Sequence, residues 1–279
     1  MASVNFLLLV LLAVAVHSAA LTLAQTVQVW WSCSPANFTP GDPCDTNLRG
    51  MLKDLATGAV SYGGYGNDTA GGGPVQSYGL AQYYGLAICY ADAPPEVCRL
   101  CLGMAAGNVT IACPRSTGAA MLYNNCLVRY ANESFLARPD MVQRFSFYNN
   151  LTMRAGDAAI YAAALGRLTY RLAPAAAASP GFSAFGRTNI SGNQSLYGFA
   201  QCVAKLSPDD CRRCLQRMAA SLPIYSRGGR AYSLTCYMRF EVVPFYTPPN
   251  TQTMVVSPAP PPEPSPGAAT AAEPQGQLF

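Results

Sequence analysis

The stretch Tyr84–Leu102, YGLAICYADAPPEVCRLCL, recurs as Tyr197–Leu215, YGFAQCVAKLSPDDCRRCL, displaced by 113 positions. In each copy the first cysteine is followed after eight residues by a second, and after two more residues by a third. These cysteines are Cys89, Cys98 and Cys101, then Cys202, Cys211 and Cys214, and they are followed by Cys126 and Cys236 respectively. A cysteine pattern that repeats together with its flanking residues predicts two tandem copies of one domain of roughly 105–110 residues.

The N-terminus has the form of a secretory signal peptide. An apolar run, Phe6–Val16, precedes small residues, and it is too short to span a bilayer. We expect cleavage after Ala24, with Ala20 as the alternative, so that residues 1–24 are removed. Seven Asn-x-Ser/Thr sequons also predict a secreted glycoprotein, with candidate sites at Asn37, Asn67, Asn108, Asn132, Asn150, Asn189 and Asn193.

An oxidising compartment favours disulfides among the eleven cysteines, although sequence alone does not fix their pairing. Cys33 and Cys113 occur only in the first copy. The displacement of 113 positions matches Cys113 to Ser226 in the second copy. Because both cysteines are missing from the second copy, we expect them to bond to each other in the first. We propose the pairs Cys33–Cys113, Cys89–Cys98, Cys101–Cys126, Cys202–Cys211 and Cys214–Cys236. Cys44 is left without a partner.

The Cys-x-x-Cys spacing also occurs in zinc and thiol-redox sites. A zinc site built from Cys98, Cys101, Cys211 and Cys214 would have to form across two domains and compete with oxidation, so disulfides are favoured. The single histidine, His17, lies in the signal peptide, and the mature chain therefore lacks the imidazole of common hydrolase mechanisms. We predict a protein that is not an enzyme, with no catalytic residues, no cofactor and no metal.

The remaining sequence predicts an α+β fold. Helices are expected over 47–60 and 157–173, and a further helix is expected to begin at Ser207 as its N-cap, with Pro208 in the first turn. Residues 62–74 are Gly-rich and predict a loop, and the Pro/Ala-rich residues 247–279 predict a disordered tail with no membrane span. Arg129 and Arg239 are expected to face outward beside buried aromatic side chains.

These motifs resemble the plant stress-antifungal domain, which is homologous to ginkbilobin. Two copies behind a signal peptide are similar to the cysteine-rich repeat secretory proteins and to the ectodomains of cysteine-rich receptor-like kinases. The resemblance covers nearly all of Val27–Tyr246, with copies at 27–137 and 141–246. It implies two helices packed on a roughly five-stranded antiparallel sheet in each copy, and it supports the proposed disulfides. Cys44 departs from the family pattern, and its thiol is either buried and free or available for a disulfide-linked dimer.

The resemblance also implies a candidate carbohydrate site. Ginkbilobin binds mannose through an Asn after the first cysteine, an Arg six residues before the last and a Glu five residues after it. The second copy offers Arg230 and Glu241, with Asn149 or Asn150 as the amide. The first copy has Ser34, Ala120 and Ala131 at these positions. Arg230 and Glu241 could instead form an exposed cross-strand ion pair of little energetic weight.

The sequence therefore predicts a secreted, apoplastic binding protein in plant stress or defence signalling. Its expected partner is an extracellular protein or a receptor-like kinase ectodomain. The alternative is a mannose-binding, lectin-like antifungal protein acting through the second copy, and a thiol-redox regulator is a third reading. The net charge of +4 is scattered, so nucleic acid is not an expected partner, although acidic wall polymers are compatible with it. A receptor ectodomain truncated before its membrane span would have the same sequence features.

Overall fold

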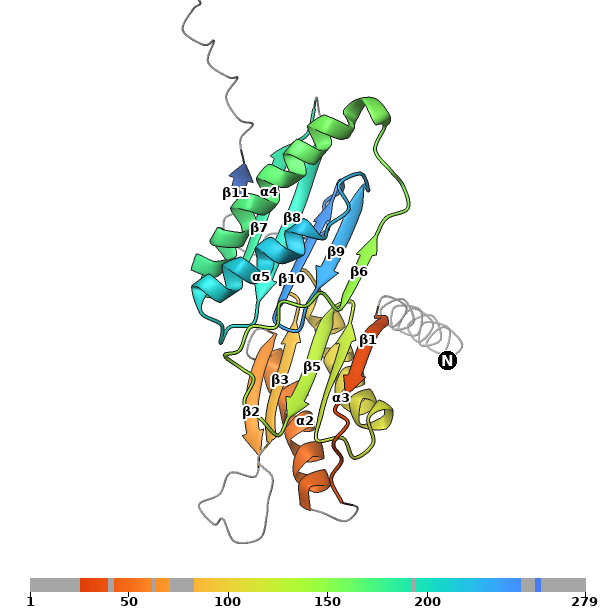
Figure 1. Cartoon of the computed structure of the whole chain (residues 1–279), viewed down its shortest axis with the longest axis vertical. Coiled ribbons are helices and arrows are strands. Elements are labelled where there is room, and N and C mark those ends of the chain that lie inside the picture. Colours follow the sequence, from red (N-terminus) through yellow and green to blue (C-terminus); the bar gives the residue numbers. More distant parts are fainter. Residues whose placement is uncertain are drawn as a thin grey trace, which may run out of the picture.

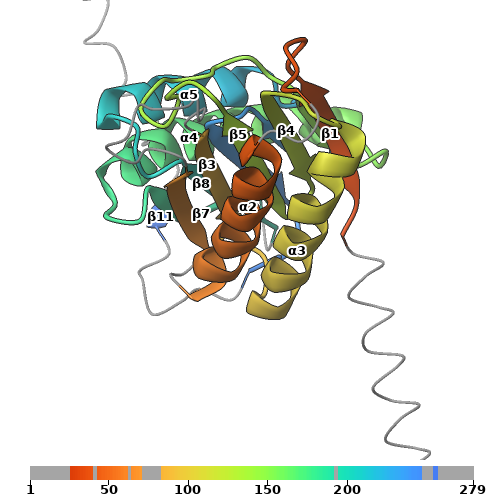
Figure 2. The ribbon, with the colours of Figure 1, turned by 90° about the horizontal axis from the view of Figure 1, so that it is seen from below.

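The computed structural model describes residues 26–39, 43–61, 64–70, 83–191, 194–246 and 254–256. Within these ranges the chain forms two α+β domains, each a sheet with two helices against one face, and both sheets are antiparallel apart from one short edge strand (Figures 1 and 2). The expected signal peptide and most of the Pro/Ala-rich tail lie outside the described residues. The expected fold class, two tandem disulfide-bonded α+β domains, is confirmed.

The first domain has a five-stranded sheet in the order β1-β4-β5-β3-β2. Its elements are β1 (Gln28–Cys33), α2 (Pro43–Ser61), β2 (Tyr65–Ala70), β3 (Tyr83–Cys89), α3 (Pro95–Ala112), β4 (Gly118–Tyr123) and β5 (Cys126–Ala131). Alternate residues of β5 point to opposite faces, as in any strand. Cys126, Val128 and Tyr130 pack in the core beneath the helices, whereas Leu127 joins the core of the second domain.

The second domain repeats this arrangement, with the sheet order β11-β7-β8-β10-β9-β6. Its elements are β6 (Phe145–Tyr148), the 3₁₀ turn η1 (Ala155–Asp157), α4 (Ala158–Ala178), β7 (Ser183–Asn189), β8 (Ser195–Cys202), α5 (Pro208–Ala220), β9 (Gly228–Tyr232), β10 (Cys236–Glu241) and β11 (Met254–Val256). The short β11 pairs in parallel with β7 and falls in the segment expected to be disordered.

Helix α4 continues beyond the predicted end at Ala173. Proline usually ends a helix because it lacks an N–H and its ring crowds the preceding turn. Here Pro174 lies inside α4, and the helix runs on to Ala178. Ala176 and Ala177 are buried in the core, and alanine has the best helix propensity, so packing and propensity offset the proline.

The Gly-rich segment expected to be a loop contains the edge strand β2, which pairs with β3. The reason is close packing against α2. A Cβ on Gly66 would lie 3.3 Å from the backbone nitrogen of Ala59, so glycine allows the strand to approach the helix. The glycine that suggested a loop is thus required by a strand.

The match of Cys113 to Ser226 was wrong. The counterpart of Ser226 in the first domain is Ser116. The Ser116 hydroxyl donates to the carbonyls of Ser34 and Gly118, and the Ser226 hydroxyl donates in the same way to those of Asn149 and Gly228. The displacement between copies is therefore 113 through the first turns of the second helix, as at Cys101 and Cys214, and 110 after that helix. At 110 positions, Cys113 corresponds to Pro223.

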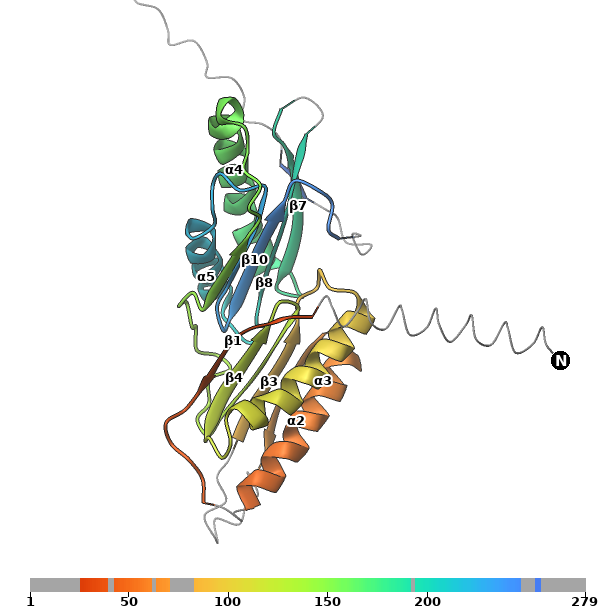
Figure 3. The ribbon, with the colours of Figure 1, turned by 90° about the vertical axis from the view of Figure 1, so that its right-hand side faces the viewer.

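The domains contact each other through the sheet faces that their own helices leave uncovered. The two helix pairs consequently lie on opposite sides of the molecule (Figure 3). The Tyr90 ring from the first domain stacks on Tyr237 of the second at a centroid distance of 4.1 Å, and Tyr237 stacks on Tyr232 at 4.7 Å. The Gln201 side chain bonds the backbone of the first domain at both Cys89 and Ala91.

Candidate functional site

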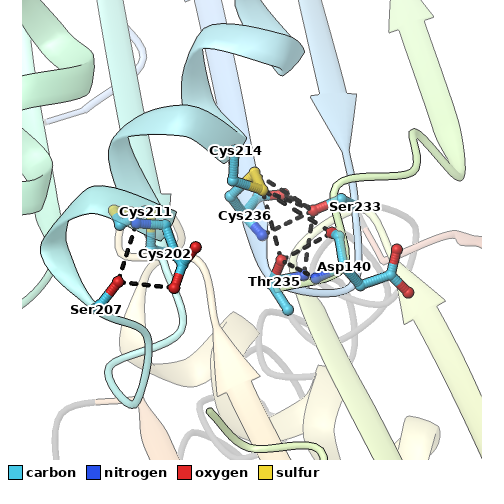
Figure 4. The surroundings of a disulfide bond; sticks show 9 residues. Asp140, Cys202, Ser207, Cys211, Cys214, Ser233, Thr235 and Cys236 are labelled. Atoms are coloured by element: carbon cyan, nitrogen blue, oxygen red, sulfur yellow. Dashed lines mark hydrogen bonds between the residues drawn. A yellow bond between two sulfur atoms is a disulfide. The ribbon is translucent and has the colours of Figure 1, made fainter. Parts of the chain in front are cut away.

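The five disulfides are the pairs proposed from the sequence. They join Cys33–Cys113, Cys89–Cys98, Cys101–Cys126, Cys202–Cys211 and Cys214–Cys236. The two cysteines of CRRC therefore belong to different bridges, one to β8 and one to β10 (Figure 4). The same separation holds for Cys98 and Cys101, so these four sulfurs are not available as zinc ligands.

Local contacts position the two disulfides that join α5 to the sheet of the second domain, Cys202–Cys211 and Cys214–Cys236. Ser207 caps α5 by accepting a hydrogen bond from the Asp210 N–H at 3.1 Å, which confirms the expected helix start. At the other side, the Ser233 hydroxyl lies 3.3 Å from the sulfur of Cys236. The sulfur of Cys214 in α5 lies 3.4 Å from the same hydroxyl, so a covalent bond and a polar contact join α5 to the β9–β10 turn.

The three residues of the candidate carbohydrate site lie on neighbouring strands of the second sheet. The Asn149 N–H donates to the Gly228 carbonyl at 2.9 Å, and Gly228 pairs with Glu241 across β9 and β10. Arg230 lies two residues further along β9, on the same face as Glu241 because strand residues alternate. All three side chains thus belong to the sheet face that α4 and α5 leave uncovered.

Backbone pairing selects between the two candidate asparagines. The Ser34 N–H donates to the Gly118 carbonyl in the first domain, as the Asn149 N–H does to Gly228. Asn149 is therefore the structural counterpart of Ser34, and Asn150 is not. The Asn149 amide oxygen accepts from the Leu151 N–H at 2.8 Å, and the side chain is exposed.

Gly228 makes room for the carboxylate of Glu241. A Cβ built on Gly228 would overlap the Glu241 carboxylate, whereas a Cβ on its counterpart Gly118 would make only ordinary contacts. This difference follows from the residue opposite, which is Ala131 in the first domain. The sequence alone did not indicate Gly228, because its position opposite Glu241 is known only from the strand register.

The alternative to a carbohydrate site was an exposed ion pair between Arg230 and Glu241. The structure does not contain this pair. The Glu241 carboxylate accepts from the Arg239 Nε at 3.2 Å, and Arg239 also bonds to Asp92 of the first domain at 2.8 Å. Asp92 is a functional candidate that the sequence analysis missed, since 147 residues separate it from Arg239.

Arg129 and Arg239 do not face solvent as expected. Arg239 has a side chain only 14% exposed and lies over the Phe245 ring at 3.9 Å, and Arg129 lies over the Phe135 ring at 4.1 Å. Cation–π contacts of this kind are stronger when partly desolvated. Both arginines occupy the uncovered sheet face, but residues following each sheet pack over them.

Two buried tyrosines, Tyr232 and Tyr237, lie next to Arg230 at the contact between the domains. Burial raises the pKa of Tyr237 well above its usual value, and burial likewise raises the pKa of Tyr232. Both phenols are therefore neutral hydrogen-bonding groups at ordinary pH. An arginine, a carboxylate and an amide supply the donors and acceptors that neighbouring sugar hydroxyls require, whereas the two phenols are buried and bonded to Asn124 and Asp92 of the first domain.

A second surface feature is an apolar edge formed by β1 and β6. Of the twelve exposed large hydrophobic side chains in the described ranges, three lie on these strands, three lie within three residues of their ends, and two lie in the segment before β9 that bonds to Met153. These eight are Val27, Trp31, Val142, Phe147, Tyr148, Leu151, Ile224 and Tyr225. The strands lie on the same side of the molecule (Figure 1). The Arg144 guanidinium, beside β6, lies over the Trp30 ring of β1 at 5.4 Å from its centroid. We call this surface the β1/β6 edge.

Comparison with known proteins places the chain in a family. Residues 32–133 and 149–242 each match the family described as salt stress response/antifungal. An antimicrobial ginkbilobin-2-like protein from Castanea crenata is 32% identical over 215 residues, covering 76% of this chain and 86% of the relative. The chain belongs to the salt stress response/antifungal family, with two copies of its domain.

Other relatives are secretory repeat proteins and receptors. The cysteine-rich repeat secretory protein 38 of Arabidopsis thaliana is 29% identical, with 75% of this chain and 81% of the relative covered. Cysteine-rich receptor-like protein kinase 25 of Arabidopsis thaliana is 29% identical over 76% of this chain, but the chain spans only 33% of that kinase.

The fold matches solved receptor ectodomains. The tandem DUF26 ectodomain of the Arabidopsis thaliana cysteine-rich receptor-like protein PDLP5 aligns with a TM-score of 0.61 and 28% identity, covering 77% of this chain and 99% of that structure. In the described part of this chain, none of the helices is long and apolar enough to cross a bilayer.

Proposed function

We propose that this chain is a secreted binding protein of the plant apoplast that acts in stress or defence signalling. It recognises an extracellular protein or a receptor-like kinase ectodomain, and it is not an enzyme. The observation that carries this proposal is the β1/β6 edge. Exposed aromatic side chains gathered in one place are typical of protein-binding surfaces, because they supply large apolar area at low entropic cost.

The edge strands add a second means of recognition. In an antiparallel pair, alternate residues direct their N–H and C=O groups away from the neighbouring strand. Asn149 bonds inward to Gly228, so Tyr148 and Ser146 direct their backbone groups outward from β6. An extended segment of a partner can pair with these groups while its side chains contact Phe147 and Tyr148.

Binding to purified tandem ectodomains of cysteine-rich receptor-like kinases, measured by biolayer interferometry, tests the proposal. Trp31→Ser and Phe147→Ser should each weaken binding about tenfold or more, since exposed aromatic anchors dominate such interfaces. Tyr170→Ser is the matched control, because Tyr170 is 71% exposed on α4, away from the edge. Equal losses in all three variants, or binding unaffected by the edge variants, would refute this use of the edge.

A second candidate function is mannose binding through Asn149, Arg230 and Glu241. Its support is that these residues share one sheet face, with Gly228 leaving space for the carboxylate. Binding of the secreted, oxidised protein to a mannose-containing glycan array should be lost in Arg230→Ala and in Glu241→Ala. It should persist in Arg187→Ala, which alters an exposed arginine elsewhere on the same sheet.

We also propose that Cys44 links two copies of the chain through a disulfide. Ten of the eleven cysteines are bonded to one another in the five disulfides, which leaves Cys44 for an intermolecular bond. Such a dimer would appear on a non-reducing gel of the secreted protein and disappear in Cys44→Ser. A protein that runs as a monomer before and after the substitution argues against it.

A further inference from the structure

A polar hollow of about 550 Å³ opens at the end of the second domain. Its volume lies within the range of about 300–1,000 Å³ common for small-ligand sites. The hollow is formed by the segment before α4, the start of β8, the residue before β9 and the residues after β10. The lining residues are Thr152, Met153, Arg154, Asp157, Gln194, Ser195, Tyr197, Arg227, Val242 and Pro244.

The hollow is separate from the candidate mannose residues. Tyr197 pairs with Glu241 across β8 and β10, so the two sites adjoin, but none of Asn149, Arg230 and Glu241 lines the hollow. Glu241 is held by Arg239 through a contact of 3.2 Å. The carboxylate of Glu241 is therefore already paired with Arg239, which does not line the hollow.

The charges that line the hollow favour an anion. Arg154 and Arg227 contribute two guanidinium groups against one carboxylate, that of Asp157. In the part of the chain that the structure describes, neither arginine lies within ion-pair distance of a carboxylate. Asp157 is also the N-cap of the 21-residue helix α4, whose N-terminal dipole end borders the hollow and favours negative charge.

The other lining groups favour a carbohydrate. Thr152, Gln194 and Ser195 offer hydroxyl and amide groups that both donate and accept, as sugar hydroxyls require. Tyr197 adds a half-buried aromatic ring against which the apolar face of a sugar can pack. Guanidinium groups bind carboxylates with two parallel hydrogen bonds, which a neutral sugar does not exploit.

We propose that this hollow binds a carboxylated sugar, a uronic acid unit of an acidic polysaccharide. Arg154 and Arg227 bind the carboxylate, and Thr152, Gln194 and Ser195 bind ring hydroxyls. The hollow shares no lining residue with the β1/β6 edge or with the mannose residues. It gives the protein a means of attachment to an acidic polymer while the edge stays available to a protein partner.

The test is isothermal titration of the full secreted protein with a linear trimer of galacturonic acid, beside the neutral trimer of galactose. The charged trimer should bind and the neutral trimer should bind at least tenfold more weakly. Raising the salt concentration should weaken the charged ligand, because exposed charges are screened. Absence of binding by the charged trimer, or equal binding of both trimers, would overturn the proposal.

Substitutions localise the binding. Arg154→Gln and Arg227→Gln should each lower the affinity roughly tenfold, as expected for loss of a charge-assisted hydrogen bond. Both side chains are exposed, so the fold should persist. Arg171→Gln removes an exposed charge 14 residues along α4 from Asp157 and should leave the affinity unchanged. An equal loss in Arg171→Gln would show general charge attraction instead of a site.

Discussion

Arg239 of the second domain bonds to Asp92 of the first at 2.8 Å, with exposed side-chain fractions of only 14% and 5%. The same guanidinium holds Glu241, so one arginine links the domain contact to the candidate mannose site. Tyr237 adds a hydrogen bond from its hydroxyl to the same Asp92 carboxylate. The relative position of the domains and the position of Glu241 are therefore coupled through three side chains.

Breaking this pair should destabilise the protein. Arg239→Gln leaves the buried Asp92 carboxylate without its cation, and the free energy of unfolding should fall by about 3 kcal/mol. Denaturant unfolding followed by tryptophan fluorescence measures the change. In Asp92→Asn/Arg239→Gln the loss should be smaller than the sum of the single losses, because the two residues interact. Strict additivity would mean that the ion pair contributes nothing of its own.

The first domain should depend on its additional disulfide. Replacing Cys33 and Cys113 by Ala opens a loop with a sequence separation of 80, and chain entropy predicts a loss of about 4.5 kcal/mol. Replacing Cys202 and Cys211 by Ala opens a separation of only 9, with a predicted loss of about 2.5 kcal/mol. Thermal unfolding of the two double variants compares them. The reverse order would show that strain or packing outweighs the loop term.

Gly228→Ala should impair mannose binding with little effect on stability. The new methyl group occupies the space of the Glu241 carboxylate, which is the flexible end of a side chain and can move away. The displaced carboxylate then leaves both Arg239 and a bound sugar. Gly118→Ala is the matched control, since its counterpart position faces Ala131. Unchanged binding of mannose glycans by Gly228→Ala would show that Glu241 is not a ligand.

Alkaline conditions should unfold the protein in a defined range. Burial raises the pKa of Tyr65, Tyr130 and Tyr246 to about 12, against about 10 in an unfolded chain. The folded state then keeps protons that the unfolded state loses, so stability is unchanged by these groups below pH 10 and falls as pH rises from about 10 to about 12. Absorbance of phenolate and circular dichroism, recorded together, follow both events.

Tyr130→Phe supplies the specific comparison for this pH dependence. It removes a titrating group together with its hydrogen bond to the Ser116 carbonyl, and its alkaline loss of stability should be smaller than that of the parent protein. Tyr170→Phe removes an exposed phenol and should keep the parent profile. Indistinguishable profiles for both variants would mean that Tyr130 does not contribute.

The sequence determined the features that depend on local or covalent chemistry. The duplicated cysteine spacing predicted two domains, and the Ser207 cap follows from a contact three residues away. The family resemblance added the sheet and helix arrangement and the residue types of the mannose site. It left Asn149 and Asn150 as alternatives because the first cysteine of the second copy is missing.

Only the tertiary structure decided the features that depend on strand register and on contacts between the domains. Three findings follow from which residues face each other across strands: the choice of Asn149, the space above Gly228, and the correspondence of Cys113 with Pro223 between the copies. The Asp92–Arg239 pair, the β1/β6 edge and the hollow near Arg154 join residues far apart in the chain. Their energies depend on distances through space that no spacing in the sequence records.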